Sequence, residues 1–309
     1  MATKTKRPAP DVYAMVTDQM LKALENEIIP WRKPWSGEDA APMNATSGKQ
    51  YRGANPLLLN CTAVCKGFDD PRWLSFKQAK AAGGNVRKGE KGSIITFWKF
   101  LKYNKVIDGE TQKAGFPMLK YFSVFNVEQC ENINEAKIKA RPEAYTPTAW
   151  EKIENAEQLT AGYLERESIK LSHVGASAHY NYFDDQVNMP ATDRFDAAED
   201  YYSTLFHELG HSTGHKKRLN REIQNKFGSA GYAREELVAE FTAAFLCGTT
   251  GIESKPIEDH AAYIASWKQK LEADPKAVIF AAGRAQKAAD MITDRQVAEA
   301  ETETETVTA

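Results

Sequence analysis

The chain has 309 residues, of which 42% are hydrophobic and 27% are charged, and its formal net charge is −2. This length suffices for two hydrophobic cores, and this composition excludes wholesale disorder. No apolar run approaches the roughly 18 residues that a membrane-spanning helix needs. The basic start MATKTKRPAP is not followed by the hydrophobic segment of a secretory signal. We therefore expect no membrane contact.

The charges are divided unevenly along the chain. Residues 1–125 contain 20 Lys and Arg against 11 Asp and Glu, whereas the remainder contains 20 against 31. A basic segment followed by an acidic one predicts two domains with different partners. The chain has only 4 cysteines, and Cys61 and Cys65 lie in an apolar stretch that favours buried thiols. Sparse cysteine favours a reducing, cytoplasmic setting.

The front domain is predicted to be α+β. Residues 1–10 read as a flexible arm, and residues 11–28 space their apolar side chains as an amphipathic helix that ends before Pro30. After a loop and a second helical run, residues 75–100 read as a short helix, a Gly-Gly stop, a basic turn and a strand. Residues 118–130 are typical of another strand. We expect this domain to cover residues 11–127.

The second half is predicted to be a separate domain that covers residues 148–295. Residues 128–147 are polar, contain prolines and show no period, which favours a linker. A helix is expected over 150–167, followed by three short strand-like segments. Further helices are expected at 196–213, 231–247, 258–271 and 275–293. The acidic repeat over 296–309 is typical of a disordered tail.

Residues 203–218, STLFHELGHSTGHKKR, contain the pattern of a metal site. Residues four apart project from one face of a helix, so His207 and His211 can bind the same ion. Glu208 lies one step round the helix, where it can take a proton from a water at the metal, as in zinc peptidases. The alternative is a buried helix whose histidines only form hydrogen bonds.

A catalytic zinc usually has three protein ligands and one open position. The candidates for the third lie in GYAREELVAEFTAAFL, where Glu236 and Glu240 share a helical face and Glu235 points elsewhere. We favour Glu236 as the ligand and Glu240 as the carboxylate that holds a ligating imidazole N–H. Zn²⁺ is the expected ion, with Mn²⁺ as an alternative. The opposing interpretation makes both glutamates ordinary surface residues.

Other histidines and tyrosines near the motif are weaker candidates. His215 continues the spacing of four, but Gly214 before it is a probable helix stop, so a solvent-facing side chain is favoured. His173 and His179 lie in strand-like segments, and an edge strand there would pair with an extended substrate. Tyr180 or Tyr182 would then assist an oxyanion, although ordinary packing is the simpler interpretation.

Cations, aromatic residues and glycines are interleaved in the front domain. Cations attract phosphates, aromatic faces stack on unpaired bases, and glycines let the backbone approach closely, which together suit single-stranded DNA. The residues expected to contact DNA are Trp31, Arg32, Lys33, Trp35, Lys49, Tyr51, Arg52, Arg87, Lys88 and Lys91. The alternative, equally weighted on composition alone, is that the tryptophans are core residues and the cations a solvated face.

Several segments, in order, resemble the plasmid-borne ArdC-type antirestriction proteins. The resemblance rests on IPWRKPW, NATSGKQYRGAN, WLSFKQAKAAGGNVRKGEKGSIITFW, FHELGHSTGHKKRLNR and YAREELVAEFTAAFL. The front domain is also similar to the amino-terminal part of conjugal primases. The resemblance implies an N-terminal single-stranded-DNA-binding domain and a C-terminal zincin-like metallopeptidase domain. It further implies metal ligands at His207, His211 and Glu236, and a catalytic Glu208.

The expected function is protection of incoming conjugative plasmid DNA from host restriction, with single-stranded DNA as partner. A protein substrate or a restriction enzyme is a further possible partner. The rival hypotheses are a DNA-tethered zinc protease that clears proteins from DNA, and a non-enzymatic binder with a structural metal. Glu208→Ala separates them, because only a protease needs the general base.

Overall fold

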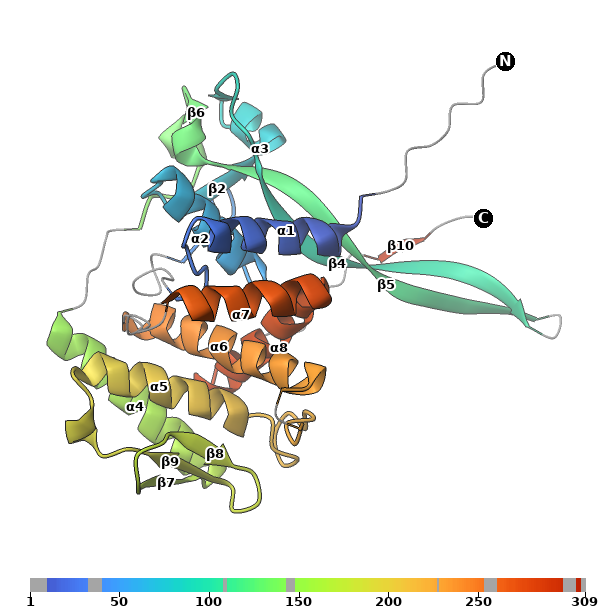
Figure 1. The fold of residues 1–309 in the computed structure, drawn as a ribbon. Coiled ribbons are helices and arrows are strands. Elements are labelled where there is room, and N and C mark those ends of the chain that lie inside the picture. The colour runs from blue at the N-terminus through green and yellow to red at the C-terminus, as the bar shows by residue number, and fades with distance from the viewer. Residues whose placement is uncertain are drawn as a thin grey trace.

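The computed structural model describes residues 10–32, 41–107, 110–142, 148–226, 228–252, 260–296 and 304–306 (Figure 1). It confirms the α+β class. The front part contains α1 (Val12–Glu25), β1 (Met43–Asn44), α2 (Asn55–Lys66), β2 (Arg72–Ser75), α3 (Phe76–Ala81), β3 (Asn85–Val86), β4 (Ser93–Ile107), β5 (Glu110–Asn126) and β6 (Cys130–Glu131). Asp11 begins α1 by accepting a hydrogen bond from the Tyr13 N–H at 2.9 Å.

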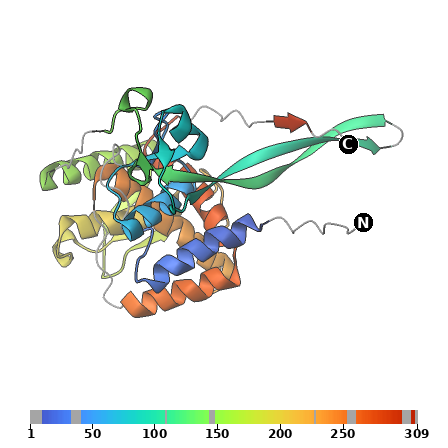
Figure 2. The same cartoon turned by 90° about the horizontal axis from the view of Figure 1, so that it is seen from above.

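The main sheet is dominated by one long hairpin. Its strand order is β1-β2-β5-β4-β10, where β10 is Thr304–Thr306. β4 and β5 pair antiparallel from Ser93↔Val124 outward, and the ribbon projects from the body of the molecule (Figures 1 and 2). β10 pairs parallel with β4, so these three residues of the predicted disordered tail form a strand. The rest of the tail from 297, and the arm over 1–9, lie outside the described residues.

Residues 128–142 differ from the predicted linker. Turns of 3-10 helix form at Val127–Gln129 and Glu135–Lys137, and β6 pairs with β3. Ile138 is buried in the cluster that contains Leu74 and Ala79. The front domain therefore continues beyond residue 127. This segment shows no hydrophobic period because its elements are only two or three residues long.

The second half consists of helices with a small sheet at one end. Its elements are α4 (Ala149–Glu167), β7 (Lys170–His173), β8 (His179–Asn181), β9 (Gln186–Met189), α5 (Ala198–Ser212), α6 (Ala230–Thr250), α7 (His260–Ala273) and α8 (Ala277–Ile292). The sheet has the order β7-β9-β8, and β8 is an antiparallel edge strand. Within the described residues, no helix is long and apolar enough to cross a membrane.

The two halves share one hydrophobic core, and Trp31 joins them. Its ring is 1% exposed and lies 5.4 Å from the ring of Phe241 and 5.7 Å from that of Trp267. Its indole N–H donates to the Tyr263 hydroxyl at 3.0 Å. The same cluster contains Met20 of α1. Trp31 is thus a core residue, and its predicted stacking on DNA bases is wrong because no face of the ring is open.

The four cysteines are free thiols. Cys61 is buried in α2, but Cys65 is exposed one turn later, which corrects the prediction that both are buried.

Candidate metal centre

Two crossing helices, α5 and α6, build the centre, and a glycine sets their separation. A Cβ placed on Gly210 would lie 3.1 Å from the Ala239 Cα and 3.2 Å from the Thr242 Cβ. Glycine is therefore needed between the two histidines of the motif, because the backbone of α6 passes directly against it. This contact brings the glutamates of α6 to the histidines of α5.

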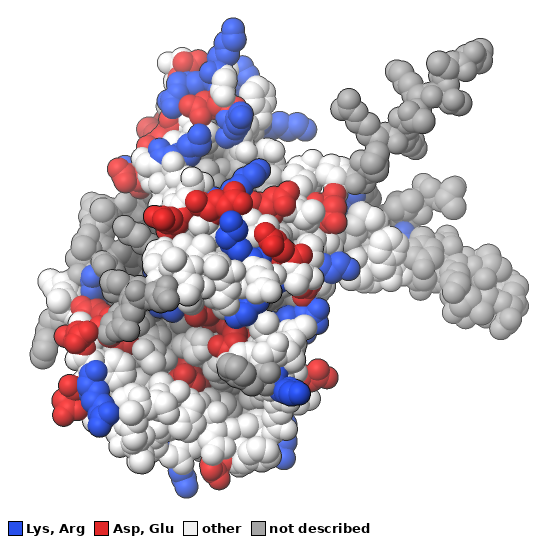
Figure 3. All heavy atoms as spheres, viewed as in Figure 1, with Lys and Arg blue, Asp and Glu red and all other residues white. Residues whose placement is uncertain are grey.

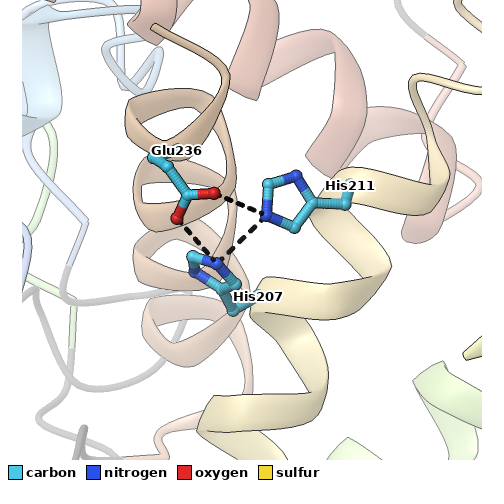
Figure 4. A group of neighbouring side chains, drawn as sticks. All are labelled: His207, His211 and Glu236. Carbon is cyan, nitrogen blue, oxygen red and sulfur yellow. Dashed lines mark hydrogen bonds and ion pairs between the residues drawn. The ribbon is translucent and has the colours of Figure 1, made fainter. Parts of the chain in front are cut away.

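His207, His211 and Glu236 converge on one point (Figure 4). The Nε2 atoms of His207 and His211 are 3.2 Å apart. The Glu236 carboxylate oxygens lie 3.6 Å from the first nitrogen and 3.5 Å from the second. Among the described residues this is the one group of His, Cys, Asp and Glu side chains close enough to hold a metal ion.

The spacing of these donor atoms fits a tetrahedral metal ion. Ligand bonds of 2.0–2.2 Å at a tetrahedral angle place ligand atoms roughly 3.4 Å apart. All three separations, 3.2 to 3.6 Å, lie close to that value. Two imidazoles and one carboxylate are also the donor types of a catalytic zinc site. The residues present therefore fit the ion that the motif implies.

The three side chains are also coupled electrostatically. Burial alone would lower the pKa of His207, but the hydrogen bond to Glu236 and the charges of Glu240 and Glu208 raise it to about 9. Burial would raise the pKa of Glu236, yet the hydrogen bond from His207 and the charge of His211 lower it to about 2. Without a metal, a proton on the His207 imidazole therefore compensates the carboxylate.

Glu235, not Glu240, holds an imidazole of this group. The Nδ1 atom of His211 lies 3.4 Å from Glu235 Oε1. Arg221 holds that carboxylate with bonds of 3.0 Å and 2.7 Å, and both side chains are 7% exposed. Glu240 instead pairs with Arg32 at 3.5 Å. The prediction that Glu240 bonds an imidazole is wrong because Glu240, one turn beyond Glu236, bonds Arg32 there, and only its charge acts on His207.

Glu208 and Tyr232 lie beside the three ligands. Glu208 is 8% exposed, and its charge acts on both His207 and Tyr232. Burial and the charges of Glu236 and Glu208 raise the pKa of Tyr232 to about 12. Sequence reasoning missed Tyr232, although its position four residues before Glu236 puts both on one helical face. Glu208 and Tyr232 thus add a carboxylate and a hydroxyl group to the surroundings of the three ligands.

A buried polar network holds the small sheet against the end of α5. Arg218, whose side chain is 1% exposed, forms an ion pair with Asp185 and bonds the Tyr180 hydroxyl at 3.0 Å. Tyr180 itself donates to Asp185 at 2.7 Å. His215 is 4% exposed with Nδ1 3.7 Å from Asp185, and Tyr182 packs on its ring.

Two expectations change as a result. His215 is buried rather than solvent-facing, because Asp185 provides a polar partner inside the fold. Tyr180 is committed to Asp185, which leaves no oxyanion role for its proton. On the neighbouring strands, His173 bonds the Tyr201 hydroxyl at 2.9 Å, and His179 is exposed on edge strand β8. Pairing of an extended substrate with β8 stays a prediction.

The residues predicted to bind DNA are divided between packing and the surface. Arg52 forms an ion pair with Asp290 of α8, and Arg32 lies over the Tyr263 ring at 5.5 Å. These cations join the two halves, and their contact with DNA stays a prediction. Tyr51 is half-buried and packs on the core cluster of Trp73, and its stacking on bases likewise stays a prediction.

The other residues predicted to contact DNA lie at the surface or outside the described residues, so their contact with DNA stays a prediction. Lys49, Arg87, Lys88 and Lys91 are exposed, and Arg87 also pairs with Glu90 at 3.2 Å. Figure 3 shows Lys and Arg side chains gathered over the end of the molecule that holds α3 and β6, with acidic side chains crossing the middle. Lys33 and Trp35 lie outside the described residues.

Comparison with known proteins agrees with the two halves of the fold. Residues 10–125 match the N-terminal domain of anti-restriction factor ArdC, and residues 155–284 match a zincin-like metallopeptidase. The metal-free crystal structure of the antirestriction ArdC protein from the R388 plasmid has 32% identity and a TM-score of 0.72, and the match covers 92% of this chain and 97% of that one. The chain belongs to the ArdC family of antirestriction proteins.

Other relatives carry the same arrangement. The Mn(II)-bound ArdC structure has 32% identity and a TM-score of 0.70, with 92% of this chain and 98% of that chain covered. An uncharacterized protein of Sinorhizobium fredii, y4eC, is 34% identical over 95% of both chains. The DNA primases TraC of Escherichia coli are 34% identical over 91% and 92% of this chain, which spans only 27% and 20% of their length. The ArdC family is therefore shown by full-length relatives, and its second half is a zincin-like metallopeptidase domain.

Proposed function

We propose that this protein is a metal-dependent antirestriction factor that binds single-stranded DNA and hydrolyses peptide bonds in its zincin-like domain. The observation that carries the enzymatic half is the convergence of His207, His211 and Glu236 beside the buried Glu208. The DNA-binding half is supported by the basic, aromatic-rich front domain and by its family match. Together they would protect incoming plasmid DNA from host restriction during conjugation.

The ligand set favours Zn²⁺, and the Mn(II)-bound ArdC relative supports Mn²⁺ as an alternative. When bound, the ion would supply a Lewis acid that polarises the scissile carbonyl and acidifies water. His207, His211 and Glu236 would hold it. Glu208 would accept the proton of the attacking water and pass it to the departing amine nitrogen. Tyr232, whose hydroxyl bonds the Glu236 carboxylate, would be free to donate to a developing oxyanion once the ion holds that carboxylate.

The catalytic step is tested with Glu208→Gln, which keeps the shape of the side chain and removes the base. The measurement is conjugation frequency of a plasmid that carries each variant into restricting and non-restricting recipients. A protease should lose protection while it retains metal, fold and DNA binding. Glu165→Gln, an exposed glutamate on α4, is the matched control and should keep protection.

The same experiment distinguishes the two alternatives. If Glu208→Gln protects as well as the unchanged protein, the function is that of a non-catalytic binder whose metal is structural, and the peptidase proposal is overturned. A DNA-tethered protease that acts on DNA-bound proteins would require both Glu208 and an intact DNA surface. A restriction enzyme or another DNA-bound protein is the class of substrate to test in that case.

A further inference from the structure

One face of the β4–β5 hairpin presents aromatic rings next to cations. Directly paired residues of an antiparallel ladder share a face, and residues two apart on one strand do so as well. The register pairs Phe97 with Lys120 and Lys99 with Met118, and Phe122 follows Lys120 by two residues. The two phenylalanines and the two lysines therefore lie on the same face.

The two rings on this face are stacked; Phe97 is half-buried and Phe122 is open to solvent. Phe97 and Phe122 have their centroids 4.7 Å apart and their planes within 3° of parallel. Phe122 is 59% exposed, and Lys120 beside it is also exposed. A large aromatic surface that the core does not use is unusual in a soluble protein and indicates a binding site.

The other face of the hairpin is already used by the fold. Leu119 is 8% exposed and belongs to the shared core, with Ile94 packed against it. Trp98 lies 6.3 Å from Phe280 of α8. These contacts anchor the ribbon, which projects from the body of the molecule (Figures 1 and 2), while Phe122 on the opposite face stays exposed. Ile95, which pairs with Phe122 on the same face, packs against the cluster of Trp73, so the aromatic pair stands where this face leaves the core.

We propose that this face of the hairpin binds single-stranded DNA, with bases stacking on Phe122 and Phe97 and phosphates contacting Lys120 and Lys99. The inference rests on the proposed function and locates its DNA-binding surface. Rings suit bases, and the adjacent ammonium groups match phosphates, which sit on every nucleotide. Bases of a duplex are already stacked on their neighbours, so this surface favours unpaired strands.

The hairpin also explains where the interface lies, since the tryptophan expected to stack on bases is in the core. Exposed Lys88 and Lys91 stand in the turn that leads into β4. Cations therefore lie both beside the ring pair and at the base of the hairpin, and a bound phosphate backbone would be attracted to both. The same surface is well separated in the chain from His207 and His211, so DNA binding and metal binding are independently testable.

The test is the affinity of the full-length protein for a fluorescently labelled oligothymidylate, measured by anisotropy. Phe97→Ala with Phe122→Ala should weaken binding by about 10- to 100-fold. Lys120→Ala should weaken it less and reduce the slope of log affinity against log salt by about 0.7. Phe183→Ala, which removes an 87% exposed ring in the second half, and Lys170→Ala, an exposed lysine on β7, are the matched controls and should bind as the unchanged protein does.

Each outcome tests either the DNA half of the proposed function or the hairpin site. If the unchanged protein does not bind the oligonucleotide, the DNA half of the proposed function fails. If it binds and the folded double variant binds equally well, only the hairpin site is overturned. The hairpin site is also overturned if Phe183→Ala lowers the affinity as much as the double variant does. Thermal unfolding and metal uptake show whether each variant is folded. Should the double variant not fold, Phe122→Leu keeps apolar bulk but removes the π face, and unchanged affinity would then overturn the site.

Discussion

Arg221 positions a metal-binding imidazole without lying among the ligands. Its guanidinium forms two bonds to Glu235, and that carboxylate faces His211 Nδ1. A further bond reaches the Gly210 carbonyl at 2.8 Å, which ties Arg221 to the helix that carries the histidines. The orientation of His211 therefore depends on a residue ten positions later in the chain, beyond the end of α5.

We predict that Arg221→Ala lowers metal affinity by roughly 10- to 100-fold, because Glu235 loses its partner and His211 its fixed tautomer. Arg221→Lys should recover only part of the metal affinity, since an ammonium group cannot form the paired bonds to Glu235. Competition with a chromophoric chelator measures the effect. Arg234→Ala is the control, because Arg234 is exposed and pairs with Asp274. Wild-type affinity in Arg221→Ala would show that this chain of contacts does not orient the ligand.

The protonation of His207 predicts how metal binding depends on pH. In the metal-free fold the pKa of His207 is about 9, against 6.5 for an unperturbed histidine. Its bond to Glu236 therefore stabilises the fold fully below pH 6.5, and this stabilisation is lost as the pH rises through 9. Glu236, with a pKa of about 2, loses its contribution only in strong acid. Because a metal needs the neutral imidazole, affinity should rise between pH 6.5 and 9.

At pH 7, metal uptake should accordingly release about one proton. Calorimetry in buffers of different ionisation enthalpy measures that number directly. The stability of the metal-free protein should fall over the same pH range. Metal uptake at pH 7 without proton release would contradict the assignment of a charged His207.

At the scale of elements, the contact between α5 and α6 is what creates the centre. Helical spacing alone places His207 beside His211, but Glu236 reaches them only because Gly210 lets α6 approach closely. On the other side of α6, Phe241 packs on Trp31. One helix therefore serves the metal centre and the shared core at once.

Alanine at two helical glycines separates packing from helix propensity. Gly210→Ala should destabilise the protein by about 1–3 kcal/mol, because the added Cβ meets α6 backbone, and should weaken metal binding. Gly283→Ala on α8 meets nothing within 4 Å and should stabilise it by about 0.5–1 kcal/mol. Urea unfolding of the metal-free proteins checks both. Equal effects at the two positions would contradict close packing at Gly210.

At the scale of the whole molecule, the two family domains are joined by one core and by ion pairs. Trp31 and Met20 of the front half lie in the same cluster as Phe241 and Trp267. Arg52 and Arg32 add ion pairs to Asp290 and Glu240. Neither half buries its apolar surface alone, so we expect them to unfold together.

The prediction is a single unfolding transition that Trp31→Ala shifts by about 3–5 kcal/mol. Tryptophan fluorescence and far-ultraviolet circular dichroism should give coincident urea curves, and added Zn²⁺ should raise the midpoint of both. Trp98→Ala, which removes a 41% exposed ring from the hairpin, is the control and should cost much less. Two separate transitions would show that the halves fold independently.

The sequence by itself determined the features that arise within one element. A spacing of four put His207 and His211 on one helical face, with Glu208 beside them, and charge counts separated a basic half from an acidic one. The order of motifs along the chain sufficed for the resemblance to ArdC, which the full-length relatives bear out.

Only the tertiary structure decided which partners these residues meet. Helical periodicity fixes directions within a helix but not how two helices are rotated against each other. The sequence therefore could not tell that Glu235 faces His211 and that Glu240 faces Arg32. Trp31 looked like a DNA contact because its burial depends on α6 and α7, more than 200 residues away. The hairpin face likewise became visible only once the strand register paired its rings and cations.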